Sequence, residues 1–145
     1  MSIRLNRKKL LCITFFLCCV LPACFSWFSV DDTQWRGLSL MEMPLLISTC
    51  LFAFALLFER IYYMLPLGIF SHLLLTAFIV YCLVNFPLLA NIQAARDLSL
   101  SFDAAQPMFW VSFALHLFHL ALFTTTEVAM QKLTKHTTPS QQHNQ

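Results

Sequence analysis

Three histidines lie within stretches that carry no formal charge, and they are the strongest candidates for chemistry in this chain. His116 and His119 are three residues apart, so they share one face of a helix, and Ser112, Phe123 and Glu127 are expected to extend this stripe. His72 lies in a separate apolar stretch. Imidazole binds transition metals and haem iron, and it can hydrogen-bond a quinone. His72, His116 and His119 are therefore the candidate cofactor-binding residues.

The depths of two of these histidines predict that they meet. His72 follows Pro66, where we expect one helix to begin, by six residues. His119 precedes Glu127, where we expect another helix to end, by eight residues. At about 1.5 Å per residue, the two depths agree within one helical turn. Facing helices would bring His72 and His119 together, with Thr76 on the same face as His72.

A structural role is the alternative for these histidines. Neutral imidazoles can hydrogen-bond across membrane helices, and Ser71, Ser112 and Thr76 are placed to help. A haem pocket also needs small residues near the macrocycle, but the chain has only Gly37 and Gly68, and we expect neither beside the histidines. We therefore predict no bound cofactor and no metal.

The other reactive residues indicate no catalytic machinery. The six cysteines include no C-x-x-C pair and lie within apolar stretches, so we expect buried free thiols. No nucleophile–base pair, phosphate-binding loop or metalloprotease signature occurs, and we predict that the protein is not an enzyme. Glu127 is expected only to mark the end of an apolar stretch. Glu42 is expected to be solvated at the outer interface, where it could also pair with Arg36 or Arg96.

Four uncharged stretches supply the elements that would position these side chains. Only 11% of the 145 residues are charged and 59% are apolar, whereas a soluble domain carries roughly 25% charged residues. A helix of about 20 apolar residues crosses a hydrocarbon core of about 30 Å. We predict an all-α, polytopic membrane protein with a single four-helix transmembrane domain over 1–130 and spans at about 10–30, 40–58, 65–86 and 107–126.

The two ends of the chain differ in composition from these stretches. Residues 131–145 are mostly Gln, Thr, Ser, His and Asn, and we expect a polar, disordered cytoplasmic tail. The basic start followed by Pro22, Ala23 and Cys24 also fits a signal peptide or a lipoprotein motif. Because apolar character continues to Val30, we favour an uncleaved first helix.

The basic residues predict the orientation. Seven would lie inside if both termini are cytoplasmic, and two, Arg36 and Arg96, would lie outside. This bias follows the positive-inside rule, so we predict an N-in, C-in protein of a bacterial inner membrane. Three tryptophans are expected to form an aromatic belt at the outer boundary. They are Trp27, Trp35 and Trp110.

Three classes of function are compatible with the sequence. We favour a non-enzymatic accessory, assembly or immunity-type protein that acts in the lipid bilayer through contacts with another membrane protein or with itself. The second class is a haem-, metal- or quinone-binding redox subunit built on His72, His116 and His119. The third is a small oligomeric transporter, channel or holin-like protein. The net charge of +2 and the unclustered basic residues predict no nucleic-acid partner.

Overall fold

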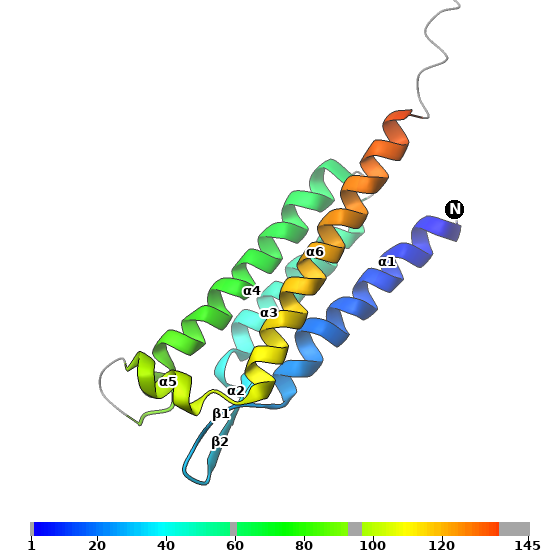
Figure 1. Cartoon of the computed structure of the whole chain (residues 1–145). Coiled ribbons are helices and arrows are strands. Elements are labelled where there is room, and N and C mark those ends of the chain that lie inside the picture. The colour runs from blue at the N-terminus through cyan, green and yellow to red at the C-terminus, as the bar shows by residue number, and fades with distance from the viewer. Residues whose placement is uncertain (1, 59–60, 93–96, 137–145) are drawn as a thin grey trace, which may run out of the picture.

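The computed structural model describes residues 2–58, 61–92 and 97–136. Most of this part of the chain is helical, with six α-helices. The long helices lie side by side, and the short elements gather at one end (Figure 1). The described residues also include a two-stranded antiparallel sheet, so the all-α prediction is wrong in that detail.

The first helical segment begins and ends earlier than predicted. Helix α1 (Ser2–Phe15) continues into a π-helix, η1 (Phe16–Val20), and a 3-10 helix, η2 (Leu21–Cys24). The backbone then becomes extended at Phe25, so the predicted helix over 10–30 is wrong at both ends. An apolar run indicates burial, but a short one does not by itself distinguish helix from strand.

A β-hairpin takes the place of the predicted end of the first helix. Strand β1 (Ser26–Val30) pairs with β2 (Thr33–Arg36) around a two-residue turn in which Asp31 has a φ of 52°. Aspartate adopts such a conformation more readily than most residues. Trp27 of β1 is buried, which overturns its predicted place in an outer aromatic belt, whereas Trp110 is 41% exposed.

The remaining helices follow the hairpin in chain order. The short helix α2 leads directly into α3, and α4 is a long helix of 29 residues. A second short helix, α5, precedes α6, which has 30 residues. Their bounds are Gly37–Leu40 for α2, Glu42–Leu57 for α3, Ile61–Leu89 for α4, Leu98–Ala104 for α5 and Pro107–His136 for α6.

Proline marks one helix end as predicted but not two others. Helix α6 begins at Pro107, in agreement with the prediction, whereas α4 contains both Pro66 and Pro87 instead of beginning and ending at them. A proline near a helix end removes few backbone hydrogen bonds, so a long helix tolerates it there. Helix α6 also continues to His136, which makes the first residues of the predicted disordered tail helical. Residues 137–145 lie outside the described part.

Two helices are long and apolar enough to cross a membrane. They cover Tyr63–Leu89 and Pro107–Lys132, with mean hydropathy values of 2.2 and 1.5. Helix α3 is apolar but has only 16 residues. By length and composition, the structure therefore supports two of the four predicted spans.

Packing between the long helices turns the histidine-bearing faces toward each other. Helix α4 contacts both α3 and α6, and α6 also contacts η1. Phe15 of α1 stacks on Phe52 of α3, with ring centroids 4.3 Å apart. At the end opposite the N-terminus (Figure 1), the hairpin contacts the start of α6 through a hydrogen bond from the Gln106 N–H to the Trp27 carbonyl, 2.8 Å long.

Candidate functional site

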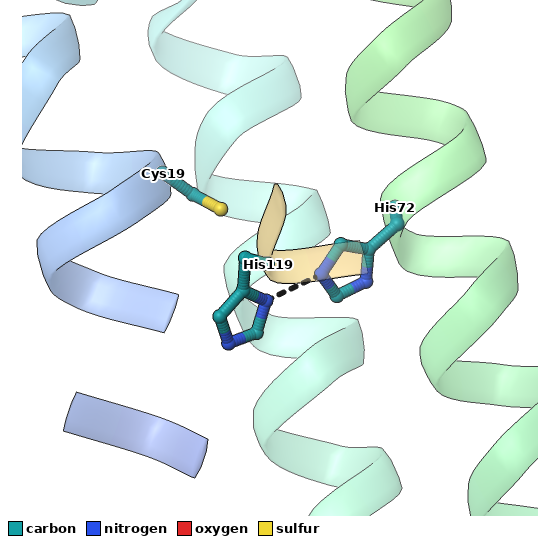
Figure 2. Close-up of side chains that lie close together, drawn as sticks. All are labelled: Cys19, His72 and His119. Carbon is teal, nitrogen blue, oxygen red and sulfur yellow. Dashed lines mark hydrogen bonds between the residues drawn. The ribbon is translucent and has the colours of Figure 1, made fainter. Parts of the chain in front are cut away.

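The structure brings the three predicted histidines together in the interior. His72 projects from α4, and His116 and His119 project from α6, and all three are at most 1% exposed. His72 Nε2 and His119 Nδ1 lie 2.8 Å apart (Figure 2). This distance confirms the predicted meeting of these two residues. The rest of the predicted stripe on α6 is also buried: it comprises Ser112, Phe123 and Glu127.

One chain of hydrogen bonds fixes the tautomers of His72 and His119. The Gly68 carbonyl lies 2.8 Å from His72 Nδ1 and can only accept, so this nitrogen carries the proton. In a neutral ring, His72 Nε2 then accepts from the His119 Nδ1–H. His119 Nε2 is left as an acceptor, and the Thr14 hydroxyl, 3.1 Å away, donates to it. All four nitrogens of the pair are satisfied without any charge.

A second chain of hydrogen bonds contains His116. Its Nε2 lies 2.8 Å from Thr76 Oγ1, and the Thr76 hydroxyl donates to the His72 carbonyl at 2.9 Å. His116 Nε2 also lies 3.2 Å from the His72 carbonyl, which can only accept, so this nitrogen carries the proton and is the donor. His116 Nδ1 then accepts from the Cys19 thiol, with a sulfur–nitrogen distance of 3.5 Å. The two chains meet at His72, so they form one polar cluster.

Cys19 is a member of this cluster that the residue types alone did not identify. It was expected to be a buried free thiol, and it is 6% exposed; the same expectation is wrong for Cys12, Cys24 and Cys50, which are exposed. The sequence contains a signal for its position, because Leu11, Phe15, Cys19 and Ala23 recur every four residues and all are buried. In an α-helix, this spacing drifts around the axis by about 40° per step. The wider turn of η1 offsets the drift and keeps Cys19 facing inward.

Cys19, His72 and His119 present one ligand atom each to a common point. These three atoms all lie within 4.8 Å of one another. Figure 2 shows the Cys19 sulfur directed from its helix toward the two imidazoles. Thiolate and imidazole together are a ligand set that suits soft or borderline transition metals. The described residues therefore include a candidate metal site of one sulfur and two nitrogens.

Aromatic rings enclose the imidazole pair. The rings of Phe15 and Phe52 lie edge-on to both His72 and His119, with centroid distances between 5.2 and 5.6 Å. The Phe123 ring stacks on His72 at 5.7 Å. A haem macrocycle or a quinone ring at this position would have to displace these side chains.

Gly68 lies beside the cluster, contrary to expectation. Its carbonyl accepts from His72, and its α-carbon faces the ring of Phe123 so closely that a methyl group there would collide with the ring. The helix therefore needs glycine at this position to let Phe123 cover His72. The Phe123 ring fills the position that a larger side chain would take at Gly68, so no open space remains there.

Replacing Gly68 by alanine is expected to lower the free energy of unfolding by about 1 to 3 kcal/mol, because the new methyl group overpacks the interior. In an unconstrained helix the same change would be stabilising by about 1 kcal/mol, so the sign of the effect is informative. Thermal unfolding in mild detergent measures it. Adding Phe123→Leu should recover part of the loss, and a higher midpoint for Gly68→Ala alone would contradict the close approach.

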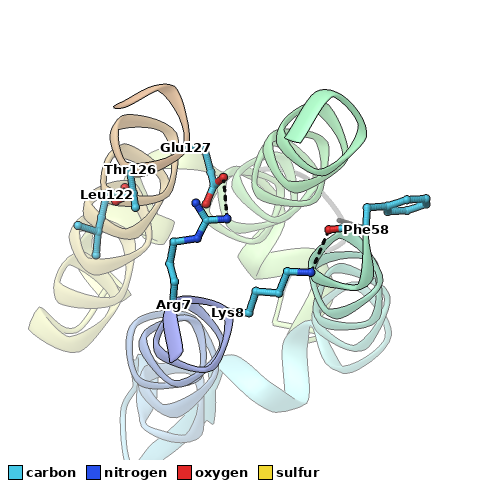
Figure 3. A network of polar contacts seen from close by, with 6 residues as sticks. All are labelled: Arg7, Lys8, Phe58, Leu122, Thr126 and Glu127. Carbon is cyan, nitrogen blue, oxygen red and sulfur yellow. Dashed lines mark hydrogen bonds and ion pairs between the residues drawn. The ribbon is translucent and has the colours of Figure 1, made fainter. Parts of the chain in front are cut away.

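A buried ion pair lies closer to the C-terminal end of α6 than the histidine cluster does. The Glu127 side chain is fully buried, and its Oε2 lies 3.5 Å from Nη2 of Arg7 on α1 (Figure 3). Neither carboxylate oxygen has a hydrogen-bond partner among the described residues. Next to Arg7, the Lys8 ammonium donates to the Phe58 carbonyl at 3.0 Å. The expectation that Glu127 only marks a boundary is wrong, because it joins α6 to α1.

Of the two pairs considered for Glu42, only the one with Arg36 can be tested. Within the described residues no ion pair joins Glu42 to Arg36, and Arg96 lies outside them. Asp97 instead caps α5 by accepting from the Leu100 N–H at 3.0 Å, and this bond lowers the pKa of the Asp97 carboxyl. Asp97 therefore stabilises the start of α5.

The interior cluster is thus the part of the described chain where reactive side chains from different helices converge. Comparisons with protein-family models, with curated proteins and with solved structures found no match for this chain.

Proposed function

We propose that the chain is an integral membrane protein with four spans, formed by α1 with η1 and η2, α3, α4 and α6. The distribution of side chains carries this proposal, because each of these helices has large apolar residues on its outer surface while polar groups face the interior. Lipid is a favourable solvent for such a surface, and water is not. Examples are Ile13 and Leu17, Leu46 and Phe54, Phe70 and Leu73, and Leu117 and Phe118.

The lengths and burial of the helices support the same arrangement. In the most apolar windows of α4 and α6, only 33% and 28% of the residues are buried, unlike a core helix of a soluble protein. The first segment has 14, 5 and 4 residues in its three parts. Its uncharged part, Leu10–Cys24, is shorter than the about 20 residues that cross a hydrocarbon core, and the long basic side chains just before it can extend to the lipid headgroups. Helix α3 is shorter, and α2 precedes it at the hairpin end (Figure 1).

The charges favour an N-in, C-in orientation in a bacterial inner membrane. The N-terminus and the C-terminal end of α6 lie at one end of the molecule (Figure 1). Arg7, Lys8 and Lys132 belong to this end, whereas Asp31 and Asp32 form the hairpin turn at the other. The positive-inside rule assigns the basic end to the cytoplasm.

We further propose a non-enzymatic role in which the protein serves a partner in the same membrane or a second copy of itself. The described polar groups of the interior are largely paired with one another, which supports a role in binding over a role in turnover. The long helices offer lipid-exposed faces to a neighbouring helix. Covalent crosslinking in membranes followed by purification in mild detergent tests this role. A chain that stays alone and monodisperse would contradict it.

Cysteine labelling is expected to give the orientation directly. In intact cells, Asp32→Cys in the hairpin turn should react with a membrane-impermeant maleimide, and Lys132→Cys should react only after the cells are opened. The wild-type chain, with its six native cysteines, supplies the background. Labelling of Lys132→Cys from outside, or recovery of the protein in the aqueous fraction, would contradict the four-span arrangement.

The histidine cluster favours a second function, the binding of a cation within the helices. Ionisable side chains at membrane depth are costly and mark ion or proton sites. The ligand atoms of Cys19, His72 and His119 lie close enough together for one ion. The enclosing Phe15 and Phe52 rings argue against the haem and quinone alternatives, and the closely packed interior argues against a pore through a single copy.

A further inference from the structure

We propose that Cys19, His72 and His119 bind one Cu(I) ion as a three-coordinate site of one thiolate and two neutral imidazoles. This inference rests on the cation-binding function proposed above and names its ion. It follows from the positions of the ligand atoms, the hydrogen-bond acceptors behind them and the charge of the surroundings.

The ligand atoms lie close to the spacing that such a site needs. With metal–nitrogen and metal–sulfur bonds of about 2.0 and 2.3 Å, ligand atoms in a trigonal plane are about 3.5 to 3.7 Å apart. His72 Nε2 and His119 Nδ1 are 2.8 Å apart because a proton joins them. When the ion replaces this proton, the two nitrogens have to move apart by less than 1 Å. The sulfur is within 4.8 Å of one ring nitrogen of each histidine and has to move by about 1 Å at most to reach the trigonal spacing.

His72 already has the form of a metal ligand. Its Nδ1–H donates to the Gly68 carbonyl at 2.8 Å, which leaves the Nε2 lone pair directed at the site. Metal-binding histidines commonly donate their other ring N–H to a carbonyl or carboxylate, which fixes the tautomer and the ring orientation. This residue therefore needs no change of protonation to bind.

His119 can become a ligand by moving one proton between its own nitrogens. When Nδ1 binds the ion, the proton resides on Nε2 and is donated to Thr14 Oγ1, 3.1 Å away. The Thr14 hydroxyl in turn donates to the Leu10 carbonyl, which is 3.0 Å away. A hydroxyl can both donate and accept, so Thr14 satisfies His119 with and without the ion.

His116 hydrogen-bonds Cys19 both with and without the ion, as Thr14 does for His119. As Cu(I) binds, the Cys19 thiol proton leaves to solvent, so one positive charge enters and one departs. The His116 proton moves from Nε2 to Nδ1, which donates to the thiolate at the 3.5 Å contact, and the Thr76 hydroxyl turns from the His72 carbonyl to donate to Nε2. His116 is thus a positioning residue that stays neutral.

Charge and ligand chemistry select Cu(I) over Zn²⁺. One thiolate and two neutral imidazoles leave a Cu(I) site with no net charge, whereas Zn²⁺ would leave one uncompensated positive charge in the interior, which is costly. The nearest carboxylate on α6, Glu127, is two turns beyond His119 and is paired with Arg7. Thiolate ligands also select Cu(I), while structural zinc sites hold four ligands.

Competition with a chelator tests the proposal. The full-length protein, purified in mild detergent without oxygen, is titrated with Cu(I) held by bicinchoninate, with Zn²⁺ in a parallel titration. We expect one Cu(I) per chain, a thiolate-to-copper absorption band in the ultraviolet, and X-ray absorption fine structure that fits one sulfur and two nitrogens. Failure to withdraw Cu(I) from the chelator, or preference for Zn²⁺, would overturn the assignment.

Matched variants identify the ligands. Cys19→Ser keeps a donor for His116 and is expected to abolish Cu(I) binding without a change in thermal midpoint, whereas Cys18→Ser in the same turn should bind like wild type. His116→Gln should keep the stoichiometry and weaken binding by about 10- to 100-fold, as for other groups that orient a ligand. Unchanged binding by Cys19→Ser, or equal losses in the two cysteine variants, would contradict the site.

The outcomes separate this inference from the functions on which it rests. A protein with the expected labelling pattern that binds Zn²⁺ at this site but not Cu(I) would leave the membrane arrangement and the cation site standing and remove only the choice of ion. A protein that binds one Cu(I) but labels at Lys132→Cys from outside would remove the topology and keep the copper site.

Discussion

Replacing Trp27 by alanine is expected to lower the free energy of unfolding by about 3 to 5 kcal/mol, the usual cost of deleting a large buried aromatic side chain. Trp27 is 1% exposed and lies between the hairpin and α6. Its ring packs edge-on against Phe109 at 5.5 Å and covers Gly37 so closely that no larger residue fits there. Trp27→Ala should therefore destabilise the packing of the hairpin, α2 and α6 together.

The polar part of the Trp27 side chain contributes separately. Its indole N–H is shared between Ser112 Oγ at 3.0 Å and the Pro22 carbonyl at 3.1 Å. Trp27→Phe keeps an aromatic ring but removes this donor, and we expect a smaller loss than for alanine, including about 1 to 3 kcal/mol for the acceptors left unpaired. Both variants are measured by denaturant or thermal unfolding in the same detergent.

Trp110 provides the matched control for this prediction. It lies near the start of α6 but is 41% exposed, so Trp110→Ala should cost far less than Trp27→Ala. Equal effects of the two alanine variants would show that Trp27 does not anchor the hairpin.

Removing the charge of Arg7 is expected to destabilise the protein by about 3 kcal/mol. Breaking a buried ion pair by deleting one partner costs about 3 to 5 kcal/mol because the other charge is left uncompensated. We expect the lower end of this range because Arg7 is 19% exposed, although Glu127 is fully buried. Arg7→Met keeps much of the side-chain volume, and the free energy of unfolding in detergent measures the effect.

A double variant distinguishes the ion pair from packing. Arg7→Met combined with Glu127→Gln removes both charges and should recover most of the stability, because the loss comes from an isolated buried charge. Lys9→Met, which removes an exposed charge two residues away on α1, is the control and should have little effect. If the double variant is as unstable as Arg7→Met alone, the electrostatic explanation is wrong.

The meeting of His72 and His119 was predictable because depth along a helix depends only on residue count. The counts were taken from Pro66 and Glu127, and the 1.5 Å rise turns each count into a height. These two residues lie inside α4 and α6 and not at their ends, so the comparison held because they stand at similar heights. The inward stripe on α6 was predictable for the same reason, since residues three or four apart share a face. Neither argument requires knowledge of the neighbouring helix.

The ends of the elements were less predictable. The apolar run from Leu10 to Val30 contains a π-helix, a 3-10 helix and a strand, because burial of Trp27 and Phe28 is satisfied by a hairpin as well as by a helix. Hydropathy reports the solvent that a residue prefers and carries little information about which hydrogen-bond pattern its backbone adopts. Because hydropathy does not locate the ends of helices, the predicted start and end of α4 and the predicted end of α6 were also wrong.

By itself, the sequence determined an apolar, mainly helical chain with histidines at matching depths, because these properties depend on composition and on counting along one helix. Tertiary structure alone decided that Cys19 joins them, that Glu127 pairs with Arg7 and that Gly68 lies against Phe123. Each of these contacts joins residues far apart in the chain. Which residues touch across two helices depends on how the helices rotate and approach, and these are set by packing of the whole interior.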